Sequence, residues 1–90
     1  MISPDSRQAS KVVIYDVPTH PSAAAARKFF LLNNIRFEER DVTRSALWAE
    51  HLMKQTGQNN DPLIEAAGKS LVGFTSTVQK QLEADLKALR

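Results

Sequence analysis

The chain contains no cysteine. Thiolates are the nucleophiles of disulfide exchange, common ligands of structural zinc and the ligands of iron–sulfur clusters. Their absence excludes thiol chemistry, thiolate metal sites and iron–sulfur clusters from these 90 residues.

The chain also lacks runs of like charge and long apolar runs. Twelve basic and ten acidic residues are mixed along it, so the net charge of +2 predicts no nucleic-acid partner. No apolar run approaches the ~20 residues of a membrane-spanning helix, and residues 1–10 do not read as a signal peptide. We therefore predict a cytoplasmic protein that does not associate with membranes. We expect one domain over residues 11–90, preceded by a flexible arm over residues 1–10; the oligomeric state stays open.

The first half of the domain predicts a strand, a helix and a second strand. Residues 11–15 form a continuous β-branched and aromatic run, typical of a strand buried on both faces in the middle of a sheet. Pro21 and the alanine run after it predict a helix that begins beside His20 and ends at Asn33-Asn34, because asparagine tolerates left-handed backbone. Residues 35–42 alternate roughly between apolar and charged, as in an edge or half-exposed strand. The helix between the two strands predicts a right-handed crossover and parallel pairing.

The next segment predicts a second helix and a hairpin. Thr43 or Ser45 can cap the helix, which ends at Thr56-Gly57. Two short strands follow, residues 63–66 and 70–72, joined by the three residues between them.

A last helix completes the domain. One of residues 75–77 caps it, and its apolar stripe consists of Val78, Leu82, Leu86 and Leu89. The larger aromatic residues are expected in the core or in helix packing; they are Phe29, Phe30, Phe37, Trp48 and Phe74. The order βαβαββα predicts an α/β domain with three helices on a four-stranded mixed sheet.

Several motifs occur in the order that glutaredoxins show. They are Tyr15, Pro18-Thr19-His20-Pro21-Ser22-Ala23, Asn34-Ile35-Arg36-Phe37, Asp41-Val42, Thr56-Gly57-Gln58, Asn60-Asp61-Pro62 and Leu71-Val72-Gly73-Phe74. From Lys11 to Leu89 the chain resembles the glutaredoxin family, which has a thioredoxin-like fold. The resemblance also implies a cis peptide bond before Pro62, whereas the residues alone favour a trans Asp-Pro bond.

The chain departs from the family where the family does its chemistry. In a glutaredoxin the segment that opens the first helix reads Pro-x-Cys-Pro-x-Cys, and its first cysteine is the nucleophile. Here His20 replaces that cysteine and Ala23 replaces the resolving one. We therefore predict no thiol-disulfide oxidoreductase activity and assign no catalytic residue.

The resemblance further implies a glutathione site at the start of the first helix, beside Pro62 and before the last helix. The residues in these places are Thr19, His20, Pro21, Ser22, Asp61, Pro62, Thr75 and Ser76. A helix start offers N–H donors and a positive dipole end to an anion, whereas the Asp61 carboxylate opposes one. The leading hypothesis is a redox-inactive binding or interaction module with a protein partner at this face, which retains a vestigial glutathione or anion site. Glutathione is the one cofactor that the resemblance suggests.

The two histidines have several interpretations. His20 is a general base or a metal ligand, because a helix start favours the neutral imidazole, or it is an inherited side chain without a role. His51 is expected on the exposed side of the second helix. No carboxylate spacing joins the two histidines, so we predict no metal site.

Two other functions stay open. A glutathione-transferase-like enzyme would use a hydroxyl of Tyr15, Ser22 or Thr19, although the helical second domain of that class is missing from these 90 residues. A subunit or detached domain would have its partner in another chain. Pro62 is interpreted as structural.

Overall fold

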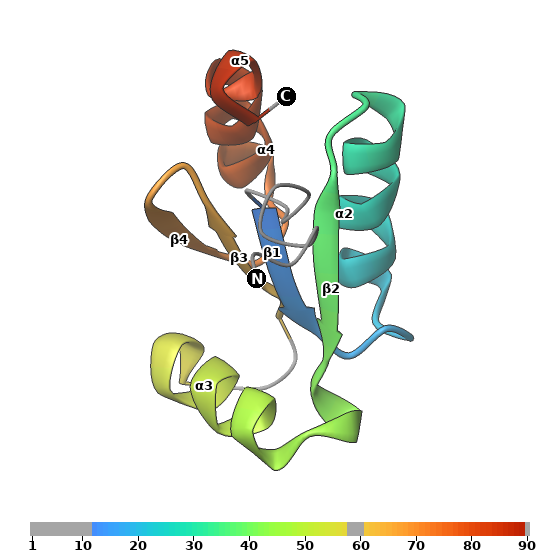
Figure 1. Cartoon of the computed structure of the whole chain (residues 1–90), viewed down its shortest axis with the longest axis vertical. Helices are drawn as coiled ribbons and strands as arrows, with labels where there is room; N and C mark the ends of the chain where they lie inside the picture. The colour runs from blue at the N-terminus through green and yellow to red at the C-terminus, as the bar shows by residue number, and fades with distance from the viewer. Residues whose placement is uncertain (1–11, 58–60, 90) are drawn as a thin grey trace, which may run out of the picture.

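The computed structural model describes residues 12–57 and 61–89. Its elements are β1 (Val12–Asp16), α2 (Pro21–Leu32), β2 (Phe37–Asp41), the 3₁₀ helix η1 (Val42–Arg44), α3 (Ala46–Thr56), β3 (Leu63–Ala66), β4 (Lys69–Val72), α4 (Ser76–Ala84) and α5 (Leu86–Leu89). The strands form one sheet in the order β2-β1-β3-β4 (Figure 1). The predicted order of elements and the mixed sheet are confirmed, whereas the arm predicted over residues 1–10 lies outside the described residues.

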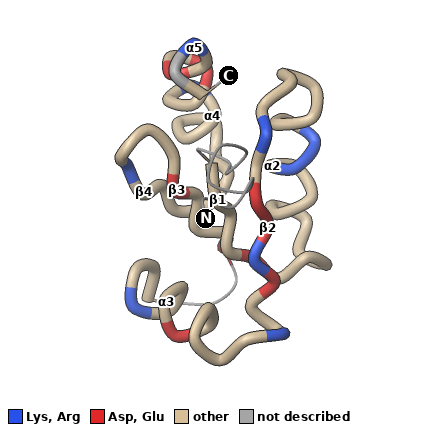
Figure 2. The backbone as a smooth tube through the Cα atoms, viewed as in Figure 1, with Lys and Arg blue, Asp and Glu red and all other residues tan. Residues whose placement is uncertain are grey.

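The central strand β1 has a partner on each side. It pairs in parallel with β2 and antiparallel with β3, and β4 pairs antiparallel with β3. The predicted parallel crossover through α2 is thereby confirmed. The charged strand β2 lies at an edge of the sheet, as its pattern indicates, and carries both signs of charge (Figure 2).

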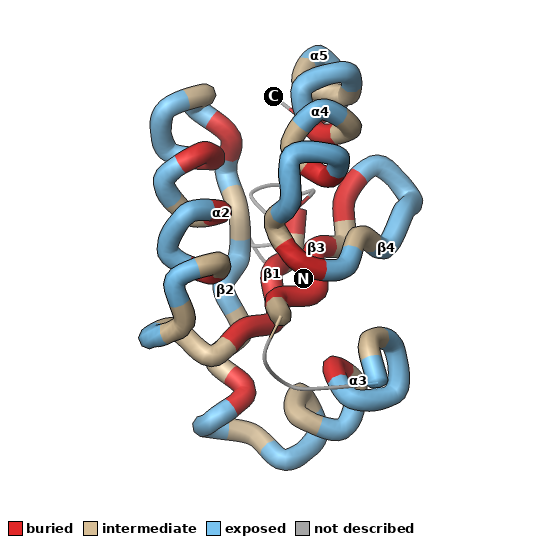
Figure 3. Tube along the Cα trace, turned by 180° about the vertical axis from the view of Figure 1, so that it is seen from behind, coloured by how far each residue is buried: buried red, intermediate tan, exposed pale blue. Residues whose placement is uncertain are grey.

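The two faces of the sheet support two separate apolar clusters. Val12 and Ile14 of β1 belong to the larger cluster, together with residues of α2, α4 and α5. Tyr15 belongs to the smaller cluster, which Leu52 of α3 helps to fill. Figure 3 shows burial concentrated on β1 and β3 and on the inner sides of the helices. The aromatic residues predicted for the core are all buried or packed against one of the clusters.

Helix boundaries follow from local capping groups. Ser45 Oγ accepts from the N–H of Trp48 at 3.3 Å, and Thr75 Oγ1 accepts from the N–H of Val78 at 3.2 Å. At the end of α2, Asn34 adopts a φ of +56°. These caps are among the predicted residues, because capping depends on short-range chemistry.

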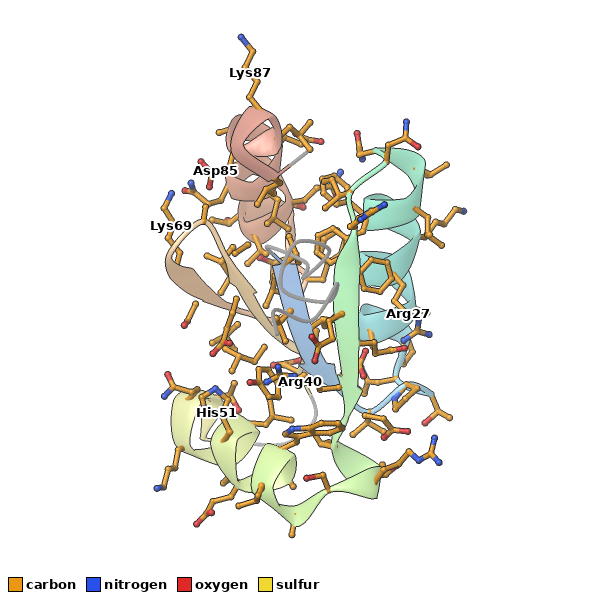
Figure 4. The ribbon with its side chains drawn as sticks, in the orientation of Figure 1. Arg27, Arg40, His51, Lys69, Asp85 and Lys87 are labelled. Atoms are coloured by element: carbon orange, nitrogen blue, oxygen red, sulfur yellow. The ribbon has the colours of Figure 1, made fainter. Side chains whose placement is uncertain are left out.

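The hairpin turn is shorter than predicted. Lys69 pairs with Ala66 as the first residue of β4, so the turn consists of Ala67 and Gly68. Lys69 Nζ lies 3.2 Å from Asp85 Oδ2, so the start of β4 contacts a residue between α4 and α5 that is distant in the sequence. Figure 4 labels both residues.

The predicted last helix is interrupted at Asp85. The N–H of Asp85 bonds back to Gln81 and Leu82, and its carboxylate accepts from Gln81 and Lys69. Leu82 and Leu89 are both buried, so the predicted apolar stripe continues across the interruption from α4 to α5.

The bond before Pro62 differs from what the resemblance implies. No cis peptide bond occurs among the described residues, so Asp61–Pro62 is trans. The trans form has the lower intrinsic free energy, by about 0.5–1 kcal/mol for an Xaa-Pro bond. Within the described part of the chain, no helix is long and apolar enough to cross a membrane.

Ala67 provides a test of the turn. Ala67 and Gly68 have φ values of +53° and +75°, as in a type I′ turn, which favours Asn-Gly. Because alanine tolerates left-handed backbone poorly, we expect Ala67→Asn to raise the free energy of unfolding in urea by about 1 kcal/mol. Gly68→Ala is the control and should lower it. An unchanged or lower stability of Ala67→Asn would contradict this turn geometry.

Candidate functional site

The predicted site segments leave the sheet at the same end. β1 ends at Asp16, opposite Asp41 at the end of β2. On the other side, Leu63 pairs with Tyr15, so Pro62 enters the sheet beside the end of β1. The N–H of Gly73 donates to the carbonyl of Pro62 at 2.7 Å, so the chain after β4 leaves there too. The sheet therefore brings the segments 19–22, 61–62 and 75–76 to one end of the domain.

At the start of α2, the structure assigns a role to His20. It is the N-cap residue, and its Nδ1 accepts from the N–H of Ser22 at 3.3 Å. Nδ1 can accept this bond only when it carries no proton, so the bond requires the tautomer with a proton on Nε2. The prediction that His20 lies at or beside the N-cap is confirmed; the roles of general base and metal ligand remain untested.

The first turn of α2 satisfies its own backbone donors. The N–H of His20 donates to the carbonyl of Val17 at 2.9 Å, and the N–H of Ala23 donates to the carbonyl of His20 at 3.1 Å. Pro21 has no N–H, and Ser22 donates to the imidazole. The donors that a helix start normally leaves open are therefore all used. An anion could gain an N–H from Ser22 only by displacing the His20 ring.

The other predicted site residues flank Gly73. A Cβ at Gly73 would lie 3.8 Å from Asp61 Cγ and 3.8 Å from Thr75 Cγ2, so both side chains lie close to this residue. Its φ of +78° turns the chain from β4 toward α4. Pro62 is buried, whereas Thr75 and Ser76 are exposed at the start of α4.

A partly buried cluster of ionisable side chains lies at the end of β1. Arg27 of α2 donates to Asp16 Oδ2 at 3.3 Å, to Glu39 Oε2 at 2.6 Å and to the carbonyl of Pro18 at 3.1 Å. The Asp16 side chain is fully buried, and within residues 12–57 and 61–89 its Oδ1 has no hydrogen-bond partner. Burial, reinforced by the neighbouring Glu39, raises the pKa of Asp16 from 3.8 to about 8, although Arg27 acts in the opposite direction. The sequence analysis missed this cluster; the only signal was an acidic residue ending an otherwise apolar strand.

A second polar cluster lies between the sheet and α3. Arg40 Nη1 donates to the hydroxyl of Tyr15 at 2.6 Å, and its guanidinium stacks over the rings of Tyr15 and Trp48. The Tyr15 side chain therefore belongs to the α3 side of the sheet, whereas α2 covers the opposite face. Its hydroxyl is already engaged there, which removes Tyr15 from the candidate hydroxyls at the start of α2.

The expectation that His51 lies on the exposed side of its helix holds only in part, because its side chain is 37% exposed and yet contacts the sheet. Its Nε2 lies 2.9 Å from Glu65 Oε2 of β3, and its ring is 4.7 Å from the ring of Tyr15. Figure 4 shows His51 and Arg40 in the region between α3 and the sheet. Helical spacing does not show which strand a helix covers, so Glu65 was not foreseen as its partner. Among the described residues, no three His, Asp or Glu side chains gather as metal ligands do.

Comparisons with solved structures identify the fold. A wheat glutaredoxin superposes with a TM-score of 0.73 at 20% identity, covering 91% of this chain and 84% of that one. An Archaeoglobus fulgidus glutaredoxin gives 0.69 at 16% identity, with 92% and 96% covered. A buckwheat glutaredoxin in complex with glutathione gives 0.69 at 18% identity, with 94% and 83% covered.

The chain has the thioredoxin-like fold of glutaredoxins. No family model and no curated protein matches it. At these identities the likeness concerns the fold, and the site is described by this chain's own residues. In this glutaredoxin-like fold, His20 is the N-cap of α2, and Ala23 in its first turn is fully buried.

The His20 cap predicts a measurable loss of stability. His20→Ala leaves the N–H of Ser22 without its acceptor and should lower the free energy of unfolding by about 1 kcal/mol. His20→Asn keeps a capping oxygen and should lose less. The control is Thr19→Ala at the exposed neighbouring position. If urea unfolding finds His20→Ala no less stable than Thr19→Ala, the cap does not stabilise the helix.

The raised pKa of Asp16 predicts how folding stability changes with pH. Its pKa is higher in the folded chain than the ordinary value of 3.8, so between about pH 4 and 8 the folded state binds more protons than the unfolded state. This contribution to stability therefore decreases as the pH rises through that window. The free energy of unfolding in urea, measured from pH 5 to 9, should fall less steeply with pH in Asp16→Asn than in the wild-type chain.

The exposed acid Asp41 provides the matched control for Asp16. Hydrogen bonds from Thr43 lower the pKa of Asp41. The stability that Asp41 contributes is therefore lost only as the pH falls. Asp41→Asn should keep the decline above pH 5 but move it to lower pH, because Asp41 is one of the charges that raise the pKa of Asp16. Equal slopes in the wild-type chain and Asp16→Asn would contradict the assignment to Asp16.

Proposed function

We propose that this chain is a redox-inactive, glutaredoxin-like binding module that recognises a protein partner through the end of the sheet where β1 finishes. The recognition surface consists of the segments 19–22, 61–62 and 75–76. Thr19, Pro21, Thr75 and Ser76 are exposed there. The proposal includes no thiol-disulfide step, since the chain has no cysteine to carry one.

One observation carries this proposal. The residue in the place of the family's nucleophile is used as a helix cap, with Nδ1 of His20 accepting from Ser22. Because this side chain is used in the helix cap, it is not poised for group transfer. This favours a role of the surface in recognition. Buried Ala23 leaves no second reactive group in that turn.

The cap also bears on glutathione, which the buckwheat relative binds. In this chain the first-turn donors of α2 are already used, and the carboxyl group of Asp61 lies beside Gly73 on the same surface. Both features disfavour an anionic ligand. We therefore propose a protein partner as the occupant and make glutathione an outcome of the test.

The first experiment asks whether glutathione binds. Amide-resolved NMR of the ¹⁵N-labelled chain is recorded with reduced and with oxidised glutathione up to millimolar concentration. We expect no saturable shifts at residues 19–22, 61–63 and 75–77 in the wild-type chain. His20→Ala opens the N–H of Ser22 and should show larger shifts than the wild type. Saturable shifts in the wild type would replace the protein partner with a retained glutathione site.

The second experiment asks whether this surface holds a partner. Captured proteins are compared among the wild-type chain, the surface variants Thr19→Arg and Ser76→Arg, and Gln55→Arg on α3. All three positions are exposed, and each substitution adds the same charge. We expect a partner that both surface variants lose and Gln55→Arg retains. A partner lost equally from all three, or from Gln55→Arg alone, would contradict the proposed surface.

A further inference from the structure

Arg27 connects the segment before α2 to the sheet edge. It projects from α2 and donates to the Pro18 carbonyl, to Glu39 of β2 and to Asp16 at the end of β1. Its contact with Glu39, at 2.6 Å, is much shorter than its contact with Asp16, at 3.3 Å. The Arg27 guanidinium therefore bonds more closely to Glu39 than to Asp16. It also donates a hydrogen bond to the carbonyl of Pro18.

The Asp16 carboxyl group is the member of this cluster whose charge is least compensated. It is fully buried, while Glu39 and Arg27 retain side-chain exposures of 29% and 25%. Its Oδ1 has no partner within the described residues. A buried carboxylate without full pairing is strongly disfavoured, so the carboxyl group retains its proton.

The charges that act on Asp16 come from two elements. Arg27 of α2 favours the ionised form, whereas Glu39 and Asp41 of β2 oppose it. On the same side of the sheet, the described core residues of β3 and α4 are apolar, and they include Ile64 and Val78. Glu39, whose carboxyl group raises the pKa of the buried acid, keeps a side-chain exposure of 29%.

We infer that the proton on Asp16 is a switch that sets the position of residues 17–20, the segment that carries His20 into the start of α2. While the proton is bound, Arg27 stays on Glu39 and on the Pro18 carbonyl. When the proton leaves to solvent, the new buried anion draws the guanidinium toward itself. The bond to Pro18 then weakens, and the segment before α2 shifts or gains mobility.

The switch involves only residues of this chain. Its importance for recognition rests on the proposed function, because residues 19 and 20 belong to the proposed surface. The pKa of about 8 for Asp16 places the transition slightly above neutral pH. The test needs no partner, so it can fail or succeed independently of the proposed function.

The experiment is an NMR pH series from 6 to 10 on the full chain, which follows backbone amides and the ¹³C signal of the Asp16 carboxyl group. We expect this carbon and the amides of residues 17–20, Arg27 and Glu39 to share one midpoint near pH 8. Asp16→Asn should abolish that midpoint and keep these amides near their low-pH positions. Asp41→Asn should retain a shared midpoint, shifted to lower pH because one of the charges that oppose ionisation of Asp16 is removed.

His20 lies inside the reporting segment, so His20→Asn serves as a second control. It removes the imidazole, keeps a capping oxygen, and should leave the shared midpoint in place. Three results would overturn the switch. They are an Asp16 carbon that titrates near its ordinary value, a midpoint that persists in Asp16→Asn, and shifts that spread evenly over the whole chain.

Discussion

The burial of β1 between two apolar clusters is the constraint on which the other elements depend. Val12 and Ile14 fill the cluster beneath α2 and α4, while Tyr15 fills the one beneath α3. The strand pairs on both sides, so its end fixes where β2 stops and where β3 begins. The same strand therefore positions the segment that enters α2. The meeting of these segments at one end of the sheet is a consequence of the core.

The start of α2 has an acceptor for each of its first backbone donors. A helix start needs acceptors for its first N–H groups, and here the carbonyl of Val17, the imidazole of His20 and its carbonyl provide them. The first backbone N–H groups of α2 therefore all have acceptors, and the surface of its first turn consists mainly of side chains. Such a surface suits shape recognition better than capture of an anion, which depends on open donors.

The sequence predicts what local chemistry decides. The buried strand β1, the caps at His20, Ser45 and Thr75, and the left-handed Asn34 all follow from neighbouring residues. Contacts between distant residues escaped prediction. The interruption at Asp85 involves Lys69, 16 residues away, and the contact of His51 with the sheet involves Glu65, 14 residues away. The cluster around Arg27 joins three elements, and no spacing within one element reveals it.

The central claim is that His20 closes the start of α2 as a neutral N-cap. Long-range ¹H–¹⁵N correlation spectra of the ¹⁵N-labelled chain at neutral pH report which ring nitrogen carries the proton. They also test for a coupling between the Ser22 amide and the ring. The account predicts an unprotonated Nδ1, a protonated Nε2 and a coupling from Ser22 N–H to Nδ1. A proton on Nδ1, together with a Ser22 amide that exchanges freely with solvent, would contradict it.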